Sequence, residues 1–361
     1  MSGAPILITG GAGFIGCNIA DRLAGEGHDV IIYDTLSRPG VAANIAWLQQ
    51  NHPGQISHLA GDVRDGAELA RAVAEAQAIF HMAAQVAVTT SLADPREDFE
   101  VNVLGTLNLL EAVRRSGRHI PVIFASTNKV YGNLSDLAFT HGTHGYEPAD
   151  PDVWAFGISE RRPLDFHTPY GCSKGAADQY VLDYSRSFGL PAAVLRMSCI
   201  YGQRQMGTED QGWVAHFLIR AIEGRPITIY GDGHQVRDIL DISDAVDAYL
   251  AVWRNIARVS GRAFNLGGGC DNAVSLRTLL DYISRLLSHD VAIRNEEWRA
   301  GDQRYFVADT RALQAELGVK PRVSWPNGVA RLAQWLAEQR GTSLFDQPAR
   351  GLAVGSAVAA E

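Results

Sequence analysis

The chain has 361 residues, of which 46% are hydrophobic and 20% are charged, and its formal net charge is −8 at pH 7. This composition is ordinary for a globular protein of one large or two modest domains. The acidic balance, without a basic stripe, argues against nucleic acid or an anionic membrane as a partner. We find neither an apolar stretch of roughly 18–20 residues nor a secretory leader, and therefore expect a cytoplasmic protein without a membrane anchor.

Four cysteines occur singly along the chain, at Cys17, Cys172, Cys199 and Cys270. None belongs to a CxxC pair or to a Cys/His spacing typical of zinc sites. We therefore expect reduced thiols, no disulfide framework and no metal. The Ala-, Gly- and Ser-rich stretch over 341–361 shows no periodicity and is expected to be a disordered tail.

From the start of the chain, short apolar runs alternate with segments whose apolar residues recur every three to four positions. The runs at 5–9, 29–33, 56–60, 78–83 and 121–125 predict buried strands, and the segments at 14–26, 65–76 and 98–116 predict helices. Such alternation is typical of βαβ units. We therefore predict an α/β fold with a Rossmann-type doubly wound parallel sheet and helices on both of its faces.

The later part of the chain is less regular. A helix starting near Tyr170 precedes a predicted strand at 192–197, a further strand is predicted at 263–267, and a helix is predicted at 327–340. We predict a first domain over 1–200, to which the strand at 263–267 returns, and a smaller C-terminal α/β lobe over 201–340. The 36 residues at 133–168 show little pattern, so they are expected to form either a functional loop or a solvated insertion.

The first predicted strand leads into the sequence "ILITGGAGFIG", in which Gly10, Gly13 and Gly16 open the first helix. Such glycines allow a tight turn and a close backbone approach, so the free N–H groups of the helix can hold a pyrophosphate. Asp34 ends the next strand, where a carboxylate accepts hydrogen bonds from ribose hydroxyls and repels a 2′-phosphate. The motif therefore predicts that the first domain binds NAD and not NADP. The alternative is a glycine turn without a ligand.

The sequence "TPYGCSKGAADQYVLDY" has Tyr170 and Lys174 four residues apart, on one face of the predicted helix. An ammonium beside a phenol favours the phenolate and lowers its pKa from about 10 toward neutral pH, so the pair can serve as acid and base. Thr127, at the exit of the strand at 121–125, could share the same substrate proton. Tyr and Lys at this spacing also occur by chance, so the prediction depends on their combination with the dinucleotide motif.

These motifs carry a resemblance to a known family. The stretches "TGGAGFIG", "HMAA", "STNKVYG" and "YGCSK" resemble the extended short-chain dehydrogenase/reductase family of nucleotide-sugar epimerases and dehydratases, over roughly residues 5–335. Finer features, among them "QVAVTTS", "DQGWV" and "GDGHQVRDIL", resemble family members that epimerise CDP-linked sugars at C2. The resemblance also implies a homo-oligomer, a dimer or tetramer, formed through the helix bearing Tyr170 and the helix at 98–116.

The resemblance implies roles for individual residues. Thr127, Tyr170 and Lys174 match the catalytic triad of the family. The implied NAD contacts, besides Tyr170 and Lys174, are Gly10, Gly13, Phe14, Ile15, Gly16, Asp34, Ser37, Arg38, Asp62, Val63, Ala83, Ala84 and Ser126. Asp62, in the stretch "GDVRD", would meet the adenine edge, and a helix cap is an equally simple explanation of Asp65.

After the threonine, sugar 4,6-dehydratases of this family carry an aspartate and a glutamate, but this chain has Asn128 and Lys129. Asparagine cannot supply an acid proton, and lysine does not replace a carboxylate base without a very different environment. Dehydration is therefore disfavoured, and oxidation followed by re-reduction at one carbon is favoured. Asn128 is expected to bond a sugar hydroxyl or the loop backbone, and Lys129 is expected at the solvated surface more than in the site.

A nucleoside diphosphate needs fixed positive charge. The resemblance implies that Arg237, Arg299 and Arg304 grip the diphosphate, since arginine bonds phosphate oxygens in pairs. The alternative for these arginines is surface ion pairing with Asp238 or Asp302. Further candidates for sugar or base contacts are Gln85, Ser91, His167, Arg204, Gln211, Trp213 and Gln235. Cys199 stands where the family often has an asparagine, and His81 is expected to be a packed residue at a strand end.

The residues and the resemblance together predict an NAD-dependent nucleotide-sugar epimerase, with a CDP-sugar as favoured substrate and C2 as the inverted carbon. A UDP-hexose 4-epimerase is the alternative within enzymes, because it would use the same triad with the sugar in another register. A non-catalytic NAD-binding sensor is the alternative from a different class. Such a sensor would have no need of Tyr170 and Lys174.

Overall fold

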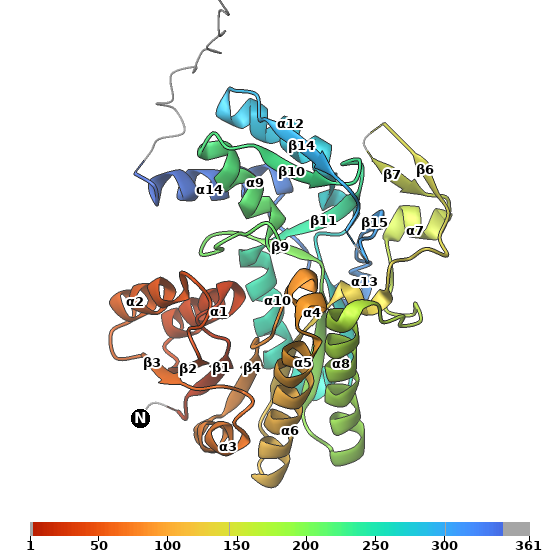
Figure 1. Ribbon diagram of the computed structural model, residues 1–361. Helices are drawn as coiled ribbons and strands as arrows, with labels where there is room; N and C mark the ends of the chain where they lie inside the picture. Colours follow the sequence, from red (N-terminus) through yellow and green to blue (C-terminus); the bar gives the residue numbers. More distant parts are fainter. Residues whose placement is uncertain (1–2, 144, 300, 342–361) are drawn as a thin grey trace, which may run out of the picture.

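The computed structural model describes residues 3–143, 145–299 and 301–341 (Figure 1). The tail predicted over 341–361 therefore lies outside the described residues, apart from Gly341. Within the described ranges, no helix is long and apolar enough to cross a membrane. The same ranges contain no group of three or more His, Cys, Asp or Glu side chains arranged to hold a metal ion. All four cysteines are free thiols.

The centre of the molecule is a seven-stranded parallel sheet with the strand order β12-β8-β5-β4-β1-β2-β3. Its strands are β1 (Ile6–Thr9), β2 (Val30–Asp34), β3 (Ile56–Ala60), β4 (Ala78–His81), β5 (Val122–Thr127), β8 (Ala192–Met197) and β12 (Ala263–Leu266). The predicted Rossmann-type parallel sheet is confirmed. Each of these strands overlaps an apolar run of the sequence, because the strands inside the sheet are covered on both faces; the edge strand β3 is largely exposed.

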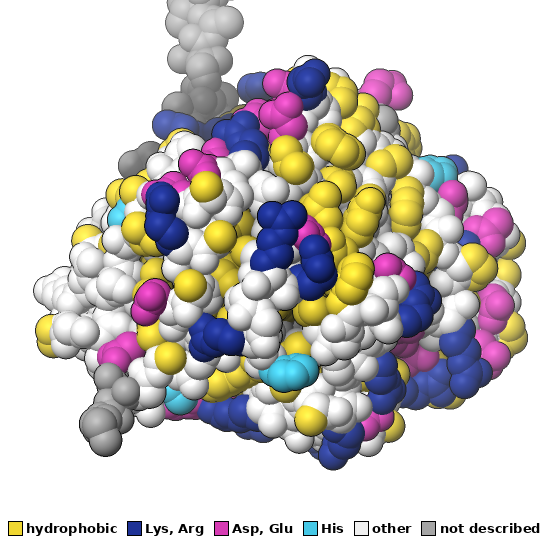
Figure 2. Space-filling view, turned by 90° about the horizontal axis from the view of Figure 1, so that it is seen from below, with side chains coloured by type: hydrophobic (Ala, Val, Ile, Leu, Met, Phe, Trp, Pro, Cys, Tyr) yellow, Lys and Arg dark blue, Asp and Glu magenta, His cyan; other side chains and the backbone are white. Residues whose placement is uncertain are grey.

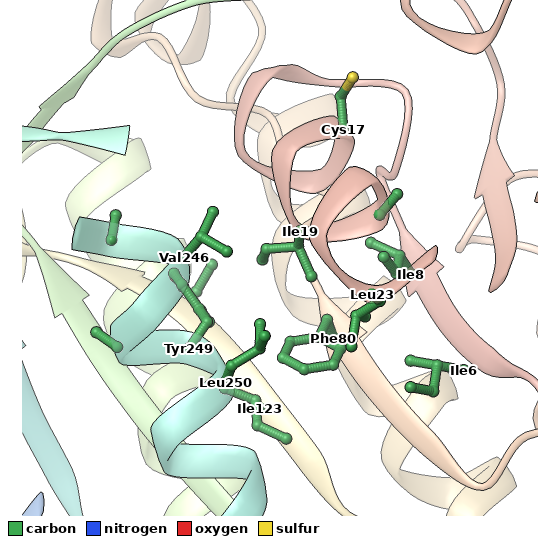
Figure 3. Packing of buried hydrophobic residues seen from close by; sticks show 14 of the residues in the cluster. Ile6, Ile8, Cys17, Ile19, Leu23, Phe80, Ile123, Val246, Tyr249 and Leu250 are labelled. Atoms are coloured by element: carbon green, nitrogen blue, oxygen red, sulfur yellow. The ribbon is translucent and has the colours of Figure 1, made fainter. Parts of the chain in front are cut away.

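Helices cover both faces of this sheet (Figure 1). One face carries α1 (Phe14–Gly25), α2 (Val41–Asn51), α10 (Ile242–Arg254), α11 (Ile256–Val259) and α13 (Arg311–Leu317), and the other carries α3 (Gly66–Glu75), α6 (Gly105–Arg115) and α8 (Thr168–Phe188). Alternate residues of β1 enter the two cores, Ile6 and Ile8 on the first face and Leu7 on the second. Figure 3 shows the first core, where Ile19 of α1 and Tyr249 of α10 pack beside Phe80.

A short helical region leads into α6. It consists of α4 (Val88–Ala93), α5 (Pro95–Phe99) and a π-helical turn, η1 (Glu100–Leu104). Both α4 and α5 contact α8. The predicted helix at 98–116 is therefore α6 with this π-helical turn and the end of α5 before it.

The smaller lobe lies above the carboxyl ends of the sheet strands (Figure 1). It contains β9 (Cys199–Tyr201), α9 (Trp213–Ile222), β10 (Ile227–Tyr230), β11 (Val236–Asp241), the 3₁₀ turn η3 (Cys270–Asn272), β13 (Ala273–Ser275), α12 (Leu276–Leu287), β14 (Ile293–Glu296), β15 (Tyr305–Phe306) and α14 (Trp325–Glu338). Strand β11 pairs with β9, β13 and β15, while β10 pairs with β14. The division at residue 200 stays a prediction; β12 lies beside β8 in the large sheet.

The segment at 133–168 differs from the prediction of a loop with little regular structure. It forms a hairpin of β6 (Phe139–His141) and β7 (Tyr146–Pro148), followed by α7 (Pro151–Phe156). Leu134 and Ile158 are buried in a small core with Phe306 of β15. Its apolar residues pack against a strand that is distant in the sequence, so they show no local periodicity from which the hairpin could be predicted.

Candidate active site

The glycine turn between β1 and α1 has the shape needed for a close backbone approach. Gly10 has a φ of 66°, and a Cβ built there would lie 2.6 Å from the backbone nitrogen of Ala83. A Cβ on Gly16 would lie 2.6 Å from the carbonyl oxygen of Gly10. Gly13 precedes α1 without a side-chain cap, so the N–H groups of Phe14 and Ile15 open the helix. The turn is therefore a cradle that fits a dinucleotide pyrophosphate.

Asp34 is held firmly beside this turn. Its carboxylate accepts hydrogen bonds from the backbone N–H of Ala12, at 3.1 Å, and of Leu36, at 2.9 Å. Ser37 and Arg38 follow in the loop after β2. The Ser37 hydroxyl accepts a hydrogen bond from Thr35. These positions suit the ribose end of a dinucleotide bound at the turn.

The exits of β3 and β4 complete the edge of this cradle. Asp62 is engaged by Arg64, whose Nη2 lies 2.6 Å from it, and this hydrogen bond holds the pKa of Asp62 below its usual value. Val63 is buried against Gly105 of α6. Asp65 caps α3, which is the alternative that the sequence offered for this residue. Ala83 and Ala84 follow β4 and are half-buried.

The three predicted catalytic residues lie together at the exit of β5. Tyr170 and Lys174 occupy the first turns of α8, and Thr127 ends β5; all three are buried. The Thr127 side chain acts on the pKa of Tyr170 as a hydrogen-bond partner, and its hydroxyl donates to the Oδ1 of Asn128 at 3.3 Å. The Lys174 Nζ donates to the carbonyl oxygen of Ala125 at 2.6 Å and lies 4.2 Å from the ring centroid of Phe124. Tyr170 and Thr127 thus meet directly, and Lys174 is fixed to the same strand.

Burial controls the proton affinities of this group. It raises the pKa of Tyr170 to about 12, with the hydrogen bond from Thr127 acting in the opposite direction. It also lowers the pKa of Lys174 to about 7, against the pull of Asp178 and Asp98. The predicted lowering of the Tyr170 pKa by Lys174 is therefore wrong for this arrangement. Removal from water is the largest influence on Tyr170, and the Lys174 ammonium is bonded to a backbone carbonyl.

Two predicted contact residues turn their hydroxyls inward. Ser91 is fully buried, accepts a hydrogen bond from the Tyr170 N–H at 3.1 Å and donates to Val88 at 2.7 Å. Ser126, also buried, donates to Asp178 at 2.7 Å. Both hydroxyls are thus used inside the protein. The predicted contacts of Ser91 with substrate and of Ser126 with NAD stay predictions.

Sequence reasoning missed Asn102, which lies on the π-helical turn η1. Its amide donates to Ser173 of α8 at 3.0 Å and to the carbonyl oxygen of Gln85 at 3.1 Å, while its oxygen accepts from the Gln85 N–H at 2.9 Å. The side chain of Gln85 closes on Ala87, with bonds of 2.8 and 2.9 Å. Asn102 is a polar residue within the apolar helical pattern at 98–116, and this could have indicated a buried hydrogen-bonding role.

Asn128 and Lys129 begin the 3₁₀ turn η2 (Asn128–Tyr131) and both meet the segment 301–303. Asn128 donates to Gln303 at 3.3 Å, and the buried Gln303 side chain donates to the carbonyl oxygen of Gly132 at 2.6 Å. The Lys129 Nζ donates to the carbonyl oxygen of Gly301 at 3.1 Å. Only 22% of the Lys129 side chain is exposed. The prediction that Lys129 is a solvated surface residue is therefore wrong, because the segment 301–303 covers it.

The predicted phosphate anchors have separate partners. Arg237 is buried on β11 and bonds Asp302 at 2.7 Å, which is the ion pair considered as an alternative. Arg299 stacks 3.8 Å from the ring centroid of Tyr230, and Arg304 is exposed, with its guanidinium 5.4 Å from the Tyr146 ring centroid. Arg237 is thus the arginine that lies beside the segment facing Lys129.

The remaining substrate candidates are spread around the smaller lobe. Trp213 donates to the Cys199 sulfur at 3.3 Å. Gln235 is buried and donates to the Tyr230 carbonyl oxygen at 2.5 Å, and Gln211 bonds Arg38.

Two candidates have other structural partners. His167 pairs with Asp165 at 2.9 Å. Arg204 lies 3.7 Å from the ring centroid of Trp47, a residue of α2, and 5.5 Å from that of Trp335 in α14. Arg204 thus packs on two tryptophan rings, whereas Arg237 is paired with Asp302.

His81 is the packed strand-end residue that the sequence predicted. It is fully buried, with Nδ1 at 2.6 Å from the Thr9 hydroxyl and Nε2 at 3.1 Å from the Thr106 hydroxyl. Burial lowers its pKa to about 3, so the ring is neutral at physiological pH.

Comparison with known proteins agrees with this geometry. The family model of the NAD dependent epimerase/dehydratase family matches residues 6–267, and the chain belongs to that family. It is 42% identical over 337 residues to a CDP-paratose 2-epimerase of Salmonella typhi, an alignment that covers 91% of this chain and 98% of that protein.

Solved structures are similar as well. The UDP-glucose 4-epimerase of Thermus thermophilus in complex with NAD has a TM-score of 0.77 and 30% identity, over 92% of this chain and 98% of that one. A dTDP-glucose 4,6-dehydratase of Streptomyces venezuelae with NAD bound has a TM-score of 0.80 and 29% identity, over 93% and 98%. The protein is thus an NAD-dependent epimerase by family, which confirms the predicted family, enzyme class and cofactor.

The glycine turn gives a first prediction. Gly16→Ala should weaken NAD binding about tenfold or more, because its Cβ would lie 2.6 Å from the Gly10 carbonyl oxygen and the turn would have to open. Calorimetric titration with NAD measures this. Gly25→Ala is the matched control in the same helix, since the nearest atom to its Cβ is 3.9 Å away, and it should bind NAD normally. A folded Gly16→Ala variant with wild-type affinity would contradict the assignment.

The buried lysine gives a second prediction. Lys174 has a pKa of about 7 when folded, below the 10.5 of the free side chain, so between these values the unfolded state binds more protons. The free energy of unfolding should therefore rise with pH, by about 2 kcal/mol from pH 7 to pH 9, relative to a Lys174→Met variant that lacks this titration. Urea unfolding of both proteins at the two pH values measures the difference. A difference that stays constant would count against a buried, proton-poor lysine.

Proposed function

We propose that the protein is a CDP-paratose 2-epimerase, which inverts the C2 centre of the sugar by transient oxidation to a ketose and re-reduction on the opposite face. The observation that carries this proposal is the strand end at β5. There a threonine and a tyrosine hydroxyl meet, and the turn that follows offers an amide and an ammonium in place of carboxylates. The 42% identity to a CDP-paratose 2-epimerase supports the choice of substrate.

The residues present fit NAD. The glycine turn and the open end of α1 would hold its pyrophosphate, and Asp34 would bind the adenosine ribose. When bound, NAD supplies a reversible hydride acceptor and a positive charge beside the phenol.

The chain's own residues handle the proton. Tyr170, as phenolate, would take the proton of the C2 hydroxyl and later return it to the same oxygen. The Thr127 hydroxyl would donate a hydrogen bond to that oxygen while its charge develops. Because burial raises the Tyr170 pKa, the phenolate needs nearby positive charge, and Lys174 in its protonated form supplies part of it.

Dehydration has no matching set of groups at this strand end. The Asn128 amide is bonded to Gln303, and the Lys129 ammonium is bonded to Gly301. Asp302, the carboxylate nearest to Lys129, is paired with Arg237 at 2.7 Å. With NAD as the hydride acceptor, oxidation at a carbon that bears a hydroxyl would require from the chain only the Tyr170 and Thr127 pair, which moves and stabilises the proton.

A UDP-hexose 4-epimerase remains the second candidate, because solved relatives include UDP-glucose 4-epimerases with the same fold. It would use the same residues with the sugar bound in another register. A sensor without catalysis is disfavoured by the cost of burying Tyr170 and Lys174 together. We also propose a cytoplasmic location, which the four free thiols support.

The function is tested by incubating the protein with CDP-, UDP- and GDP-linked sugars in deuterated water. We expect interconversion of CDP-paratose and its C2 epimer without deuterium in the product, since the hydride never exchanges with solvent. Nuclear magnetic resonance of the product measures both features. Turnover of UDP-hexoses alone would favour the second candidate, and deuterium uptake would indicate an enolising route in place of direct hydride return.

The matched control for this test is Tyr170→Phe. It should still bind NAD and lose epimerisation by a factor of about 10² to 10⁴, as expected for removal of a general acid and base. Retained turnover in this variant would argue against Tyr170 as the proton-transfer group.

We further propose that the protein forms a homo-oligomer through α6 and α8. Large apolar side chains are exposed on and beside these helices: Leu92, Phe99, Leu104, Tyr180 and Phe188. Figure 2, viewed from the end where α6 and α8 finish, shows hydrophobic side chains gathered over one stretch of the face. An exposed apolar stretch of this kind is typical of an interface with another protein surface.

The oligomer is tested with Phe99→Glu, which should lower the molar mass measured by light scattering from that of an oligomer to that of a monomer, because a charge would be buried in the interface. Trp154→Glu, on α7, replaces an equally exposed aromatic residue outside the proposed interface and should leave the mass unchanged. A wild-type protein that is monomeric at micromolar concentration would contradict the proposal.

A further inference from the structure

Lysine is scarce in this chain. Of the 32 lysine and arginine residues, three are lysines: Lys129, Lys174 and Lys320. Lys174 belongs to the catalytic group, and Lys320 is exposed. Lys129 lies two residues after Thr127, in a position that is mostly covered. Most cationic side chains of this chain are arginines, but a lysine stands at the exit of the catalytic strand. Its compact ammonium has three donors and differs in shape from the planar guanidinium of arginine.

The Lys129 ammonium belongs to a small charged cluster. Its Nζ lies 3.9 Å from the Oδ1 of Asp302, and Arg237 donates to the same oxygen at 2.7 Å. Asp302 therefore serves as counter-ion to two cations, and the cluster carries a net positive charge. In the part of the chain that the structure describes, the ammonium has one hydrogen bond within 3.5 Å, to Gly301. Two of its three N–H groups remain available to a ligand.

The shared counter-ion distinguishes this cluster from the nearby Arg299. Arg299 has two carboxylates close to its guanidinium, Glu209 at 3.7 Å and Asp210 at 3.4 Å, and so lies in a balanced setting. By contrast, Lys129 shares Asp302 with Arg237; burial lowers the pKa of Lys129, Asp302 raises it, and Arg237 lowers it again, with a smaller raising effect from Cys199. A covered cation without a full counter-ion is costly unless an anion completes the site.

We propose that Lys129 is a substrate-binding residue that, together with Arg237, holds the diphosphate of the nucleotide sugar at the exit of β5. The inference rests on the proposed function, since it takes the substrate to be a nucleotide sugar. Each phosphate of such a substrate carries a negative charge, and two cations sharing one carboxylate complement it. Because Lys129 follows Thr127 on the same turn, it would hold the phosphate nearest to the sugar.

The competing explanation is that Lys129 is only a structural link, here called a strut, which joins η2 to the segment 301–303 and binds no ligand. A strut would affect the stability of the fold, and it would affect binding of one-phosphate and two-phosphate nucleotides alike. A phosphate ligand would affect the second phosphate selectively. The two roles therefore separate in the ratio of the affinities for CDP and CMP.

The test is calorimetric titration of the NAD-loaded protein with CDP and with CMP. We expect the wild type to bind CDP more tightly than CMP, and Lys129→Met to lose about tenfold or more in CDP affinity with little change for CMP. Lys129→Gln is a second variant that keeps a polar end and should show the same selective loss. Lys320→Met, the matched control at an exposed lysine, should bind both nucleotides as the wild type does.

Failure of this inference can be told apart from failure of the proposed function. If the wild type prefers CDP and the folded Lys129 variants keep the same ratio of CDP to CMP affinity, Lys129 does not hold phosphate while the proposed function stands. An equal loss for both nucleotides would identify the strut. If the wild type binds NAD but neither CDP nor UDP, the proposed function fails and this inference fails with it.

Discussion

Asp178 and Arg196 form an ion pair that is almost wholly buried between α8 and β8, with their charged atoms 2.9 Å apart. Its hydrogen bonds extend to the Ser126 hydroxyl on β5 and to the phenol of Tyr131 on η2. Because Asp178 lies one turn beyond Lys174, this pair fixes the rotation of α8 relative to β5. The meeting of Tyr170 and Thr127 depends on that rotation. Breaking such a pair leaves an uncompensated charge inside the protein, so the network constrains the site strongly.

The same burial that orders the site makes its acid and base harder to ionise. It raises the pKa of Tyr170 to about 12 and lowers that of Lys174 to about 7, which favours neutral forms of both groups. Positive charge from a bound cofactor would lower the pKa of Tyr170 and favour its phenolate form. The site therefore resembles other enzyme sites in which perturbed proton affinities mark the groups that react.

Much of the fold could be predicted from the sequence because its signals are local. Apolar runs identified all seven strands of the large sheet, and the glycine motif, Tyr170, Lys174 and Thr127 follow fixed spacings near strand ends. Lys129 could not be placed, since the segment that covers it lies more than 170 residues away. The hydrogen-bond partners of the Ser91 and Ser126 hydroxyls could not be predicted for the same reason, since Tyr170 and Asp178 come from α8. The hairpin within 133–168 likewise packs on a distant strand.

The side chain of Gln303 joins the two halves of the molecule at one point. It accepts a hydrogen bond from Asn128 and donates one to Gly132, so both ends of the turn after the catalytic strand are tied to the neighbour of Asp302. These two hydrogen bonds link the proposed phosphate anchors, Lys129 and Arg237, to the strand end that carries Thr127. In the proposed mechanism, the ketose presents first one face of C2 and then the other to the cofactor, while its diphosphate stays bound. On the proposed mechanism, the two hydrogen bonds of Gln303 would hold the anchoring residues still while the sugar turns.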